Sequence, residues 1–349
     1  MAGFAVVAAD VFCDADTRRD ASQAVQLDYA EGGFEPVEFR RRVFPLLADD
    51  QAVFVYGSGF ETRPELLEEI SRHCRVAGND ADVVRTAKDP GLFFACLAAL
   101  GLPFPEIALT PPRQAGGWIS KRVGGSGGTH VQAGLALEGP RRYYQRQVPG
   151  VPCSLLFLAD GRQVRAVGYN QQVLAPSTHM PYRYGGAVSQ AALPRTVRAG
   201  MCVAAARITS AMGLHGLNSL DCMVDGERFQ VLEVNPRLSA TFALYDAATE
   251  GARLLRAHLA ACAGELAPDL DPEPSQAHLI YYAPHAVSIP AGVEWPEWVA
   301  DVPPDGTRIL ADTPMCTVMA AGDDAHGALA LARLRVGQLA QQINLLRNQ

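Results

Sequence analysis

The side chains best suited to chemistry lie in residues 230–237, which read QVLEVNPR. Side chains on a β-strand alternate between its faces, so Glu233, Asn235 and Arg237 are expected to project together with Val231. Carboxylate and amide oxygens are hard ligands that suit Mg²⁺ held with substrate phosphates, and an arginine beside them can hold a phosphoryl or carboxylate group. Taken alone, the segment favours a solvated strand face with a Glu–Arg pair.

A single acid, Asp221, lies inside the apolar run before this segment, and an Asp-Gly pair at 225–226 then marks a turn. The pattern predicts a hairpin. A two-residue turn at 225–226 would put Asp221 and Glu233 on opposite faces of the hairpin. A three-residue turn over 225–227 would set Asp221 opposite Val231 and diagonal to Glu233, within reach of one cation. A shared metal site therefore predicts the three-residue turn.

A lysine followed by a glycine-rich loop offers a second kind of chemistry. Lys121 ends a strand-like run, and residues 124–128 read GGSGG. Backbone N–H groups without neighbouring side chains can surround phosphate oxygens, and the lysine adds a fixed charge. The spacing is not that of a P-loop, and the segment alone also fits a flexible hairpin loop. Lys88, just before a predicted helix, reads by itself as a surface lysine.

The elements that carry these residues are those of a mixed α/β chain. Apolar runs over 4–8 and 52–56, the second followed by Gly57-Ser58-Gly59 and a helix start at Pro64, are typical of a parallel sheet. Periodicity and turn residues predict helices over 17–28, 82–101, 195–212, 239–263 and 324–347, β-rich structure over 117–190, strands over 217–236 and 277–322, and an acidic, proline-rich linker over 265–275.

Bulk properties limit the classes of function. The chain has 349 residues, enough for two or three domains, with 48% hydrophobic and 19% charged residues. A net charge of -7 argues against a general nucleic-acid or membrane-surface binder. The eight cysteines form no CxxC pair, and no apolar run approaches the roughly 18 residues of a membrane span. The singly placed cysteines fit a reduced, cytoplasmic compartment. The first residues have no basic segment before their apolar run, so we expect a strand there and not a signal peptide.

In their order along the chain, these features resemble the ATP-grasp superfamily over about residues 80–240. The resemblance implies an ATP-grasp fold of the α/β (α+β) class in which two β-rich subdomains clasp ATP. It implies an N-terminal parallel α/β domain over 1–85, a central subdomain with a glycine-rich lid over 86–190, and a C-terminal subdomain with the metal site and a closing helix over 191–349. ATP and two Mg²⁺ ions, with Mn²⁺ as a substitute, are the implied ligands.

The resemblance also implies a role for each motif. Lys88 and Lys121 would contact the nucleotide, Asp221, Glu233 and Asn235 would hold the metal ions, and Arg237, with Lys121, would act on the reacting acyl or phosphoryl group. The lid residues implied to cover the phosphates are Gly124, Gly125, Ser126, Gly127 and Gly128.

The hinge departs from the family pattern. Relatives usually carry an acid in the hinge segment and another after its Pro-Gly, whereas this chain has an arginine and a glutamine at the first place and Val-Pro-Cys at the second. Gln145 and the backbone of Gln147 and Val148 remain as adenine contacts. The departure puts the ribose contact and a strict preference for ATP in question.

The family chemistry implies an ATP-dependent carboxylate–amine ligase that forms an amide through an acylphosphate. The chain also resembles a branch of predicted carboligases linked to pterin- or furan-dependent one-carbon cofactors, which includes a tyramine–glutamate ligase. The rival interpretations are a bicarbonate-activating carboxylase and a nucleotide-binding regulatory subunit. The expected partners are small acids and amines, without nucleic acid or membrane, and a homodimer is compatible. Substrate contacts are expected at strand ends and in the loop after His179, at Asp10, Ser58, Tyr184 and Gly185.

Overall fold

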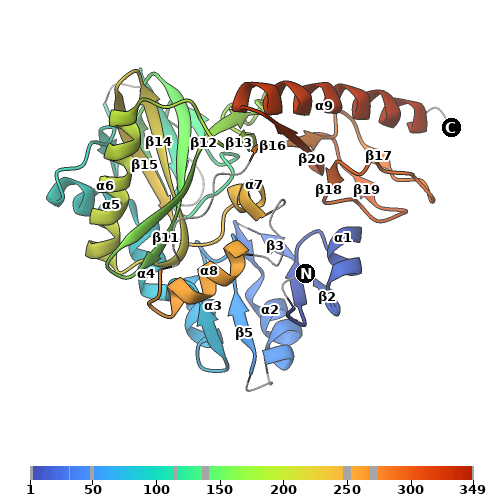
Figure 1. The fold of residues 1–349 in the computed structure, drawn as a ribbon, viewed down its shortest axis with the longest axis horizontal. Coiled ribbons are helices and arrows are strands. Elements are labelled where there is room, and N and C mark those ends of the chain that lie inside the picture. Colours follow the sequence, from blue (N-terminus) through green and yellow to red (C-terminus); the bar gives the residue numbers. More distant parts are fainter. Residues whose placement is uncertain are drawn as a thin grey trace.

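The computed structural model describes residues 3–30, 32–47, 51–113, 116–135, 141–246, 253–266 and 274–347. The N-terminal part (blue in Figure 1) contains two parallel strand pairs, β1 with β2 and β5 with β6. A short antiparallel hairpin, β3 with β4, follows the first pair. The elements are β1 Val7–Asp10, α1 Ala15–Asp20, β2 Gln23–Gln26, β3 Tyr29–Ala30, β4 Gly33–Phe34, α2 Pro36–Val43, a 3₁₀ turn Phe44–Leu47, β5 Val53–Val55, α3 Pro64–Ile70 and β6 Arg75–Ala77.

Two of the predicted helices differ in the structure. The helix expected over 17–28 is wrong in its second half, because Val25 and Leu27 are buried on either side of an exposed Gln26, a period of two that suits strand β2. The helix expected over 82–101 is two helices, α4 Ala81–Lys88 and α5 Pro90–Ala99. Pro90 lacks an N–H and disfavours helical backbone at Asp89, which instead caps α5.

A small antiparallel sheet follows, with the strand order β7-β10-β8-β9. Its strands are β7 Ile107–Ala108, β8 Trp118–Arg122, β9 Gln132–Ala133 and β10 Arg142–Arg146. Lys121 on β8 pairs directly with Tyr143 on β10. This sheet therefore carries Lys121 to the edge of the glycine-rich loop.

The main sheet has eight antiparallel strands in the order β15-β14-β11-β12-β13-β16-β20-β18. Its strands are β11 Val151–Asp160, β12 Val164–Leu174, β13 Tyr184–Val188, β14 His215–Asp225, β15 Arg228–Asn235, β16 Ser275–Tyr282, β18 Val299–Ala300 and β20 Pro314–Gly322. The boundary expected at residue 190 falls inside this sheet, since β11 hydrogen-bonds to β14. The mixed α/β class with a large antiparallel sheet agrees with the predicted fold class.

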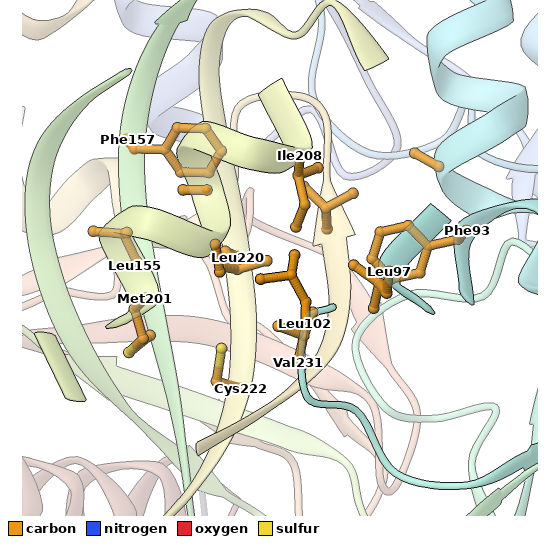
Figure 2. Packing of buried hydrophobic residues seen from close by; sticks show 14 of the residues in the cluster. Phe93, Leu97, Leu102, Leu155, Phe157, Met201, Ile208, Leu220, Cys222 and Val231 are labelled. Carbon is orange, nitrogen blue, oxygen red and sulfur yellow. The ribbon is translucent and has the colours of Figure 1, made fainter. Parts of the chain in front are cut away.

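Helices cover both faces of this sheet. The side chains of α5 and of α6, Arg195–Met212, pack with Leu155, Leu220 and Val231 in the largest core (Figure 2). On the other face α8, Arg253–Cys262, packs on Leu156 and other leucines of β11 and β14. Asp221 pairs with Ser154 and so lies on the α8 face, while its neighbours Leu220 and Cys222 enter the core.

The C-terminal part follows its predicted pattern of short strands and a closing helix. Helix α9, Ala325–Arg347, packs along β16 and β20 (red in Figure 1). The remaining elements are a 3₁₀ turn Ala240–Phe242, α7 Ala243–Asp246, β17 Val287–Ser288 and β19 Arg308–Ile309. The linker expected over 265–275 lies mostly outside the described residues. Within the described part of the chain, no helix is both long and apolar enough to cross a membrane.

Candidate nucleotide and metal site

The hairpin of β14 and β15 brings Asp221 directly opposite Glu233. The predicted three-residue turn is wrong, because Asp225 pairs with Arg228 and leaves a two-residue turn. The pairing then shifts by one residue between Asp221 and Cys222, which is a β-bulge. The bulge, rather than the turn, places the two carboxylates on one face.

The expectation that Val231 shares a face with Glu233 is also wrong, because of the bulge. Val231 and Val234 are both fully buried in the core, whereas Leu232 and Glu233 line a pocket. One extra residue in β15 allows both valines to face inward. A strict alternation would have put Val231 beside Glu233.

The two carboxylates have different electrostatic surroundings. Burial, and then the charge of Glu233, raise the pKa of Asp221 above its usual range. Burial alone would raise the pKa of Glu233, but Lys88 and Lys121 lower it below the usual range. The pair therefore attracts cations and already holds one, the Lys88 ammonium.

The surroundings of the Lys88 ammonium show whether the metal cluster, Asp221, Glu233 and Asn235, suits a metal ion. Lys88 Nζ donates to Asn235 Oδ1 at 2.7 Å and to Glu233 Oε2 at 3.3 Å, while Asn235 Nδ2 donates to Asp221 Oδ2 at 3.2 Å. Two hard oxygens thus contact one positive charge, and such oxygens are the ligands that Mg²⁺ prefers. No described group of three His, Cys, Asp or Glu side chains could hold a metal alone. The donor set fits Mg²⁺ that also takes phosphate oxygens.

Lys121 is a second lysine whose charge acts on Glu233. Burial lowers the pKa of Lys121, but Tyr143 and then Glu233 raise it, and the net pKa lies above its ordinary value. The ammonium lies 5.6 Å from the centroid of the Tyr143 ring. Lys121 therefore keeps its charge although its side chain is buried, as a phosphate contact requires.

The glycine-rich loop is folded down against two other parts of the chain. A Cβ on Gly124 would come within 2.9 Å of Glu61 O, and one on Gly128 within 2.0 Å of Tyr182 O. Gly127 O accepts a hydrogen bond from Tyr184 N at 2.9 Å. Gly124 and Gly125 line the same pocket as Lys88 and Glu233. The loop therefore packs against Glu61 and residues 182–184 and forms part of the pocket wall.

The pocket has further walls that come from α5, β8, β10 and the loop before β9. Its lining includes Phe93, Phe94, Arg122, His130 and Tyr143. Burial lowers the pKa of His130 to about 4, so its ring is neutral near pH 7. The pocket therefore combines apolar walls with lysine and arginine charges and the two glycine residues.

The hinge residues differ in their freedom to bind a base. Gln145 lies on the same strand face as Tyr143, is 2% exposed, and its Nε2 has no hydrogen-bond partner. The Gln147 N–H donates to Gly117 O at 2.9 Å, so that hydrogen is already used. No hydrogen bond involves Val148 N among the described residues. Gln145 and Val148 therefore keep free groups for a ligand.

Arg237 is held by the N-terminal part of the chain. Its Nε donates to Glu61 Oε1 at 2.7 Å, and both side chains are at least nine-tenths buried. Nη1 donates to Leu238 O at 3.0 Å. Glu61 also accepts from Gly59 N at 2.7 Å, so the guanidinium has a fixed orientation beside Asn235.

The expected substrate residues are divided between two places. Burial of Tyr184, and then the nearby charge of Asp221, raise the pKa of the tyrosine. The Tyr184 hydroxyl is 2.8 Å from His278 Nε2. Gly185 packs against Ala175. Asp10 caps its own loop through Phe12 N and Cys13 N, its charge contributes to raising the pKa of Asp301, and no described hydrogen bond joins it to Asp221, Glu233 or Asn235. Ser58 is exposed and makes no described contact with the cluster.

Sequence reasoning assigned no role to Glu61, Gln172 or His278. Gln172 hydrogen-bonds to Asp221, and His278 meets Tyr184. Both stand on inner strands of the main sheet, where their partners come from other strands. Only Glu61 had a local signal, its place directly after the glycine-rich strand end GSGF.

Comparisons with known proteins agree with this geometry. A family model described as an ATP-grasp domain matches residues 88–241. No curated protein sequence matches the chain. The biotin carboxylase domain of Hydrogenobacter thermophilus 2-oxoglutarate carboxylase, in complex with MgADP and bicarbonate, has a TM-score of 0.72 at 12% identity over 95% of this chain and 84% of that one.

Two further structures share the fold. N5-carboxyaminoimidazole ribonucleotide synthetase from Thermotoga maritima has a TM-score of 0.64 at 11% identity, covering 98% of this chain and 92% of that one. Rhizobium etli pyruvate carboxylase has a TM-score of 0.69 at 15% identity over 93% of this chain. The chain spans only 34% of the length of that carboxylase. Residues 88–241 thus match the ATP-grasp domain model, and the chain shares the overall fold of these structures.

Proposed function

We propose that this chain is an Mg-ATP-dependent ligase that joins a carboxylate to an amine through an acylphosphate. The observation that supports this most is the cluster in which Glu233 and Asn235 accept from the Lys88 ammonium and Asp221 accepts from Asn235, beside a pocket that the glycine-rich loop also lines. A cluster that draws cations together beside a phosphate-type loop suits phosphoryl transfer, in which positioning and charge neutralisation dominate.

The reaction has two steps. A carboxylate oxygen of the acid attacks the γ-phosphorus of ATP, the bond to the bridging oxygen breaks, and ADP leaves. The amine nitrogen then attacks the acyl carbon, phosphate leaves, and the amine loses a proton to give the amide. Mg²⁺, when bound, neutralises the phosphate oxygens.

The chain's own residues have distinct tasks in these steps. Lys88 and Lys121 bind phosphate oxygens, and Arg237, oriented by Glu61, stabilises the acylphosphate. The closed lid excludes water, which would otherwise hydrolyse the acylphosphate. Gln145 and the backbone of Val148 offer hydrogen-bonding groups to the base.

A second candidate is a carboxylase that activates bicarbonate. The fold shared with carboxylase domains, one of them bound to bicarbonate, favours it. This reaction would need no organic acid in the first step. Both candidates use the same phosphate and metal residues.

The deciding experiment is a screen for ADP and phosphate release with pairs of acids and amines, with bicarbonate in a separate arm. Glutamate with tyramine and glutamate with pterin precursors come first, because the motifs resemble a branch linked to one-carbon cofactors. Release that needs both an acid and an amine supports the ligase, and release with bicarbonate alone supports the carboxylase. Nucleotide binding without release in any arm would contradict both and favour a regulatory subunit.

A further inference from the structure

The polar side chain of Asn79 is buried where the N-terminal part meets the main sheet. It is 1% exposed and lies between β6 and the N-cap of α4. Its Nδ2 is 2.9 Å from Pro236 O and 2.8 Å from Asn218 Oδ1, and its Oδ1 accepts from His215 N at 2.8 Å. One amide therefore joins the N-terminal part to β14 and to the end of β15.

The contact with Pro236 matters because of its place in the chain. Pro236 stands between Asn235 and Arg237, just after the last pair of the β14–β15 ladder. Proline has no N–H, so strand hydrogen bonds cannot continue to hold this segment. Its carbonyl is held instead by Asn79 and by the Tyr56 hydroxyl at 3.2 Å.

Tyr56 completes the arrangement. It is 4% exposed, and its hydroxyl also donates to Asn79 O at 2.6 Å. Burial raises the tyrosine pKa well above its ordinary value, so the hydroxyl stays neutral and remains a donor. The single hydroxyl hydrogen is directed mainly at the main-chain carbonyl of Asn79 and reaches Pro236 O as a longer, weaker branch. Tyr56 thus fixes the main chain of Asn79, whose side-chain amide holds the Pro236 carbonyl.

Helix α4 connects this contact to the metal cluster. It begins directly after Asn79 and Asp80 and ends at Lys88, whose ammonium binds Asn235 Oδ1. The helix therefore touches the Asn235–Pro236 segment at both of its ends. Glu61 holds Arg237, the next residue, from the same side.

We infer that Asn79, with Tyr56, is a positioning residue that sets the geometry of the metal ligand Asn235. The inference rests on the proposed function and adds that the N-terminal part determines how tightly the cluster binds a divalent cation. A purely structural role would lower stability without changing metal affinity.

The test measures Mn²⁺ binding by electron paramagnetic resonance in the presence of a non-hydrolysable ATP analogue, together with the melting temperature. Tyr56→Phe removes a single hydroxyl and should weaken Mn²⁺ binding about fivefold, the effect of one net hydrogen bond. Asn79→Asp keeps the acceptor for His215 N, loses the donor to Pro236 O, and should weaken binding further.

Tyr245→Phe is the matched control. It removes the hydroxyl of a half-buried tyrosine, which donates to Asn170 Oδ1 at 2.6 Å and makes no described hydrogen bond to Pro236. It should lower the melting temperature but leave Mn²⁺ affinity unchanged. The inference is overturned if Tyr56→Phe keeps wild-type Mn²⁺ affinity, or if Tyr245→Phe weakens it equally. Wild-type protein that binds no Mn²⁺ with the analogue would overturn the proposed function as well.

Discussion

The Lys88 ammonium lies 2.7 Å from Asn235 Oδ1, where it interacts with the same oxygens that would hold a divalent cation. A lysine and a metal ion cannot both occupy that position. Nucleotide phosphates, which attract the ammonium, would draw it away and free the oxygens. Metal binding is then expected to depend on nucleotide.

Replacing Lys88 should remove that dependence on nucleotide. Lys88→Met keeps the buried chain length but removes the competing charge, so Mn²⁺ should bind the nucleotide-free protein about tenfold more tightly. Titration followed by electron paramagnetic resonance measures this. Lys121→Met is the comparison and should give a smaller gain, since Lys121 contacts Tyr143 rather than Asn235. Equal affinity in wild type and Lys88→Met would contradict the competition.

Removing Glu233 should end catalysis without unfolding the protein. Its side chain is 28% exposed, and its repulsion of Asp221 offsets its ion pair with Lys88. Glu233→Ala is therefore expected to lose Mg-dependent ADP release while the melting temperature changes by only a few degrees. Glu227→Ala, at the exposed hairpin tip, is the control and should keep activity. Unchanged turnover in Glu233→Ala would refute the metal site.

Alanine substitutions at two neighbouring glycines can distinguish the effect of lid closure from that of backbone strain. Gly127 and Gly128 both have positive φ, so alanine costs about 1 kcal/mol at either. A Cβ on Gly127 meets nothing within 4 Å, whereas one on Gly128 would lie 2.0 Å from Tyr182 O. Gly128→Ala should therefore hold the lid open and raise the ratio of ADP released to amide formed. The same ratio in Gly127→Ala and Gly128→Ala would exclude this closed position during turnover.

The buried pair of Arg237 and Glu61 should show strong coupling. Arg237→Met leaves the Glu61 carboxylate buried without its partner and should lower the free energy of unfolding by about 3–5 kcal/mol. Adding Glu61→Gln should recover part of that loss but no activity. Urea denaturation of the two single variants and the double variant measures the coupling. Additive losses would show that the two side chains do not interact.

His278 should make stability depend on pH on the acid side. Burial lowers its pKa to about 4, below the ordinary value near 6.5. Between these two pH values the folded state binds fewer protons than the unfolded state. The stability present above about pH 6.5 is therefore lost as the pH falls from 6.5 to 4. Between pH 7.5 and 4.5, wild type should lose about 2–3 kcal/mol more than His278→Gln. Equal losses in urea denaturation at the two pH values would contradict this, since the other buried histidines are common to both proteins.

Sequence patterns predicted most of the elements because the relevant signals are local. The closing helix and the short strands after residue 277 follow from apolar periodicity, and the break between α4 and α5 is visible in hindsight at Asp89-Pro90. The strand over 23–26 was missed because its alternation covers only a few residues. Its partner, β1, lies sixteen residues earlier.

The site was less accessible to prediction. Asp221 and Glu233 were expected on one face, and they do lie opposite each other. The expected cause, a three-residue turn, was wrong, because a β-bulge aligns them. A bulge arises from how Val231 and Val234 pack in the core, and core packing is a tertiary property. Glu61, Asn79 and His278 meet partners more than ninety residues away, so no short motif announces them.

The bulge lies directly beside the carboxylates, so it determines the alignment of Asp221 with Glu233, and the hairpin tip does not. The tip residues Gly226 and Glu227 are exposed, and no Cβ contact restricts Gly226. A cysteine introduced at Glu227 could therefore carry a fluorescent label that leaves the metal cluster intact. The same hairpin would then report, from its solvent end, on motions of the strand that holds the site.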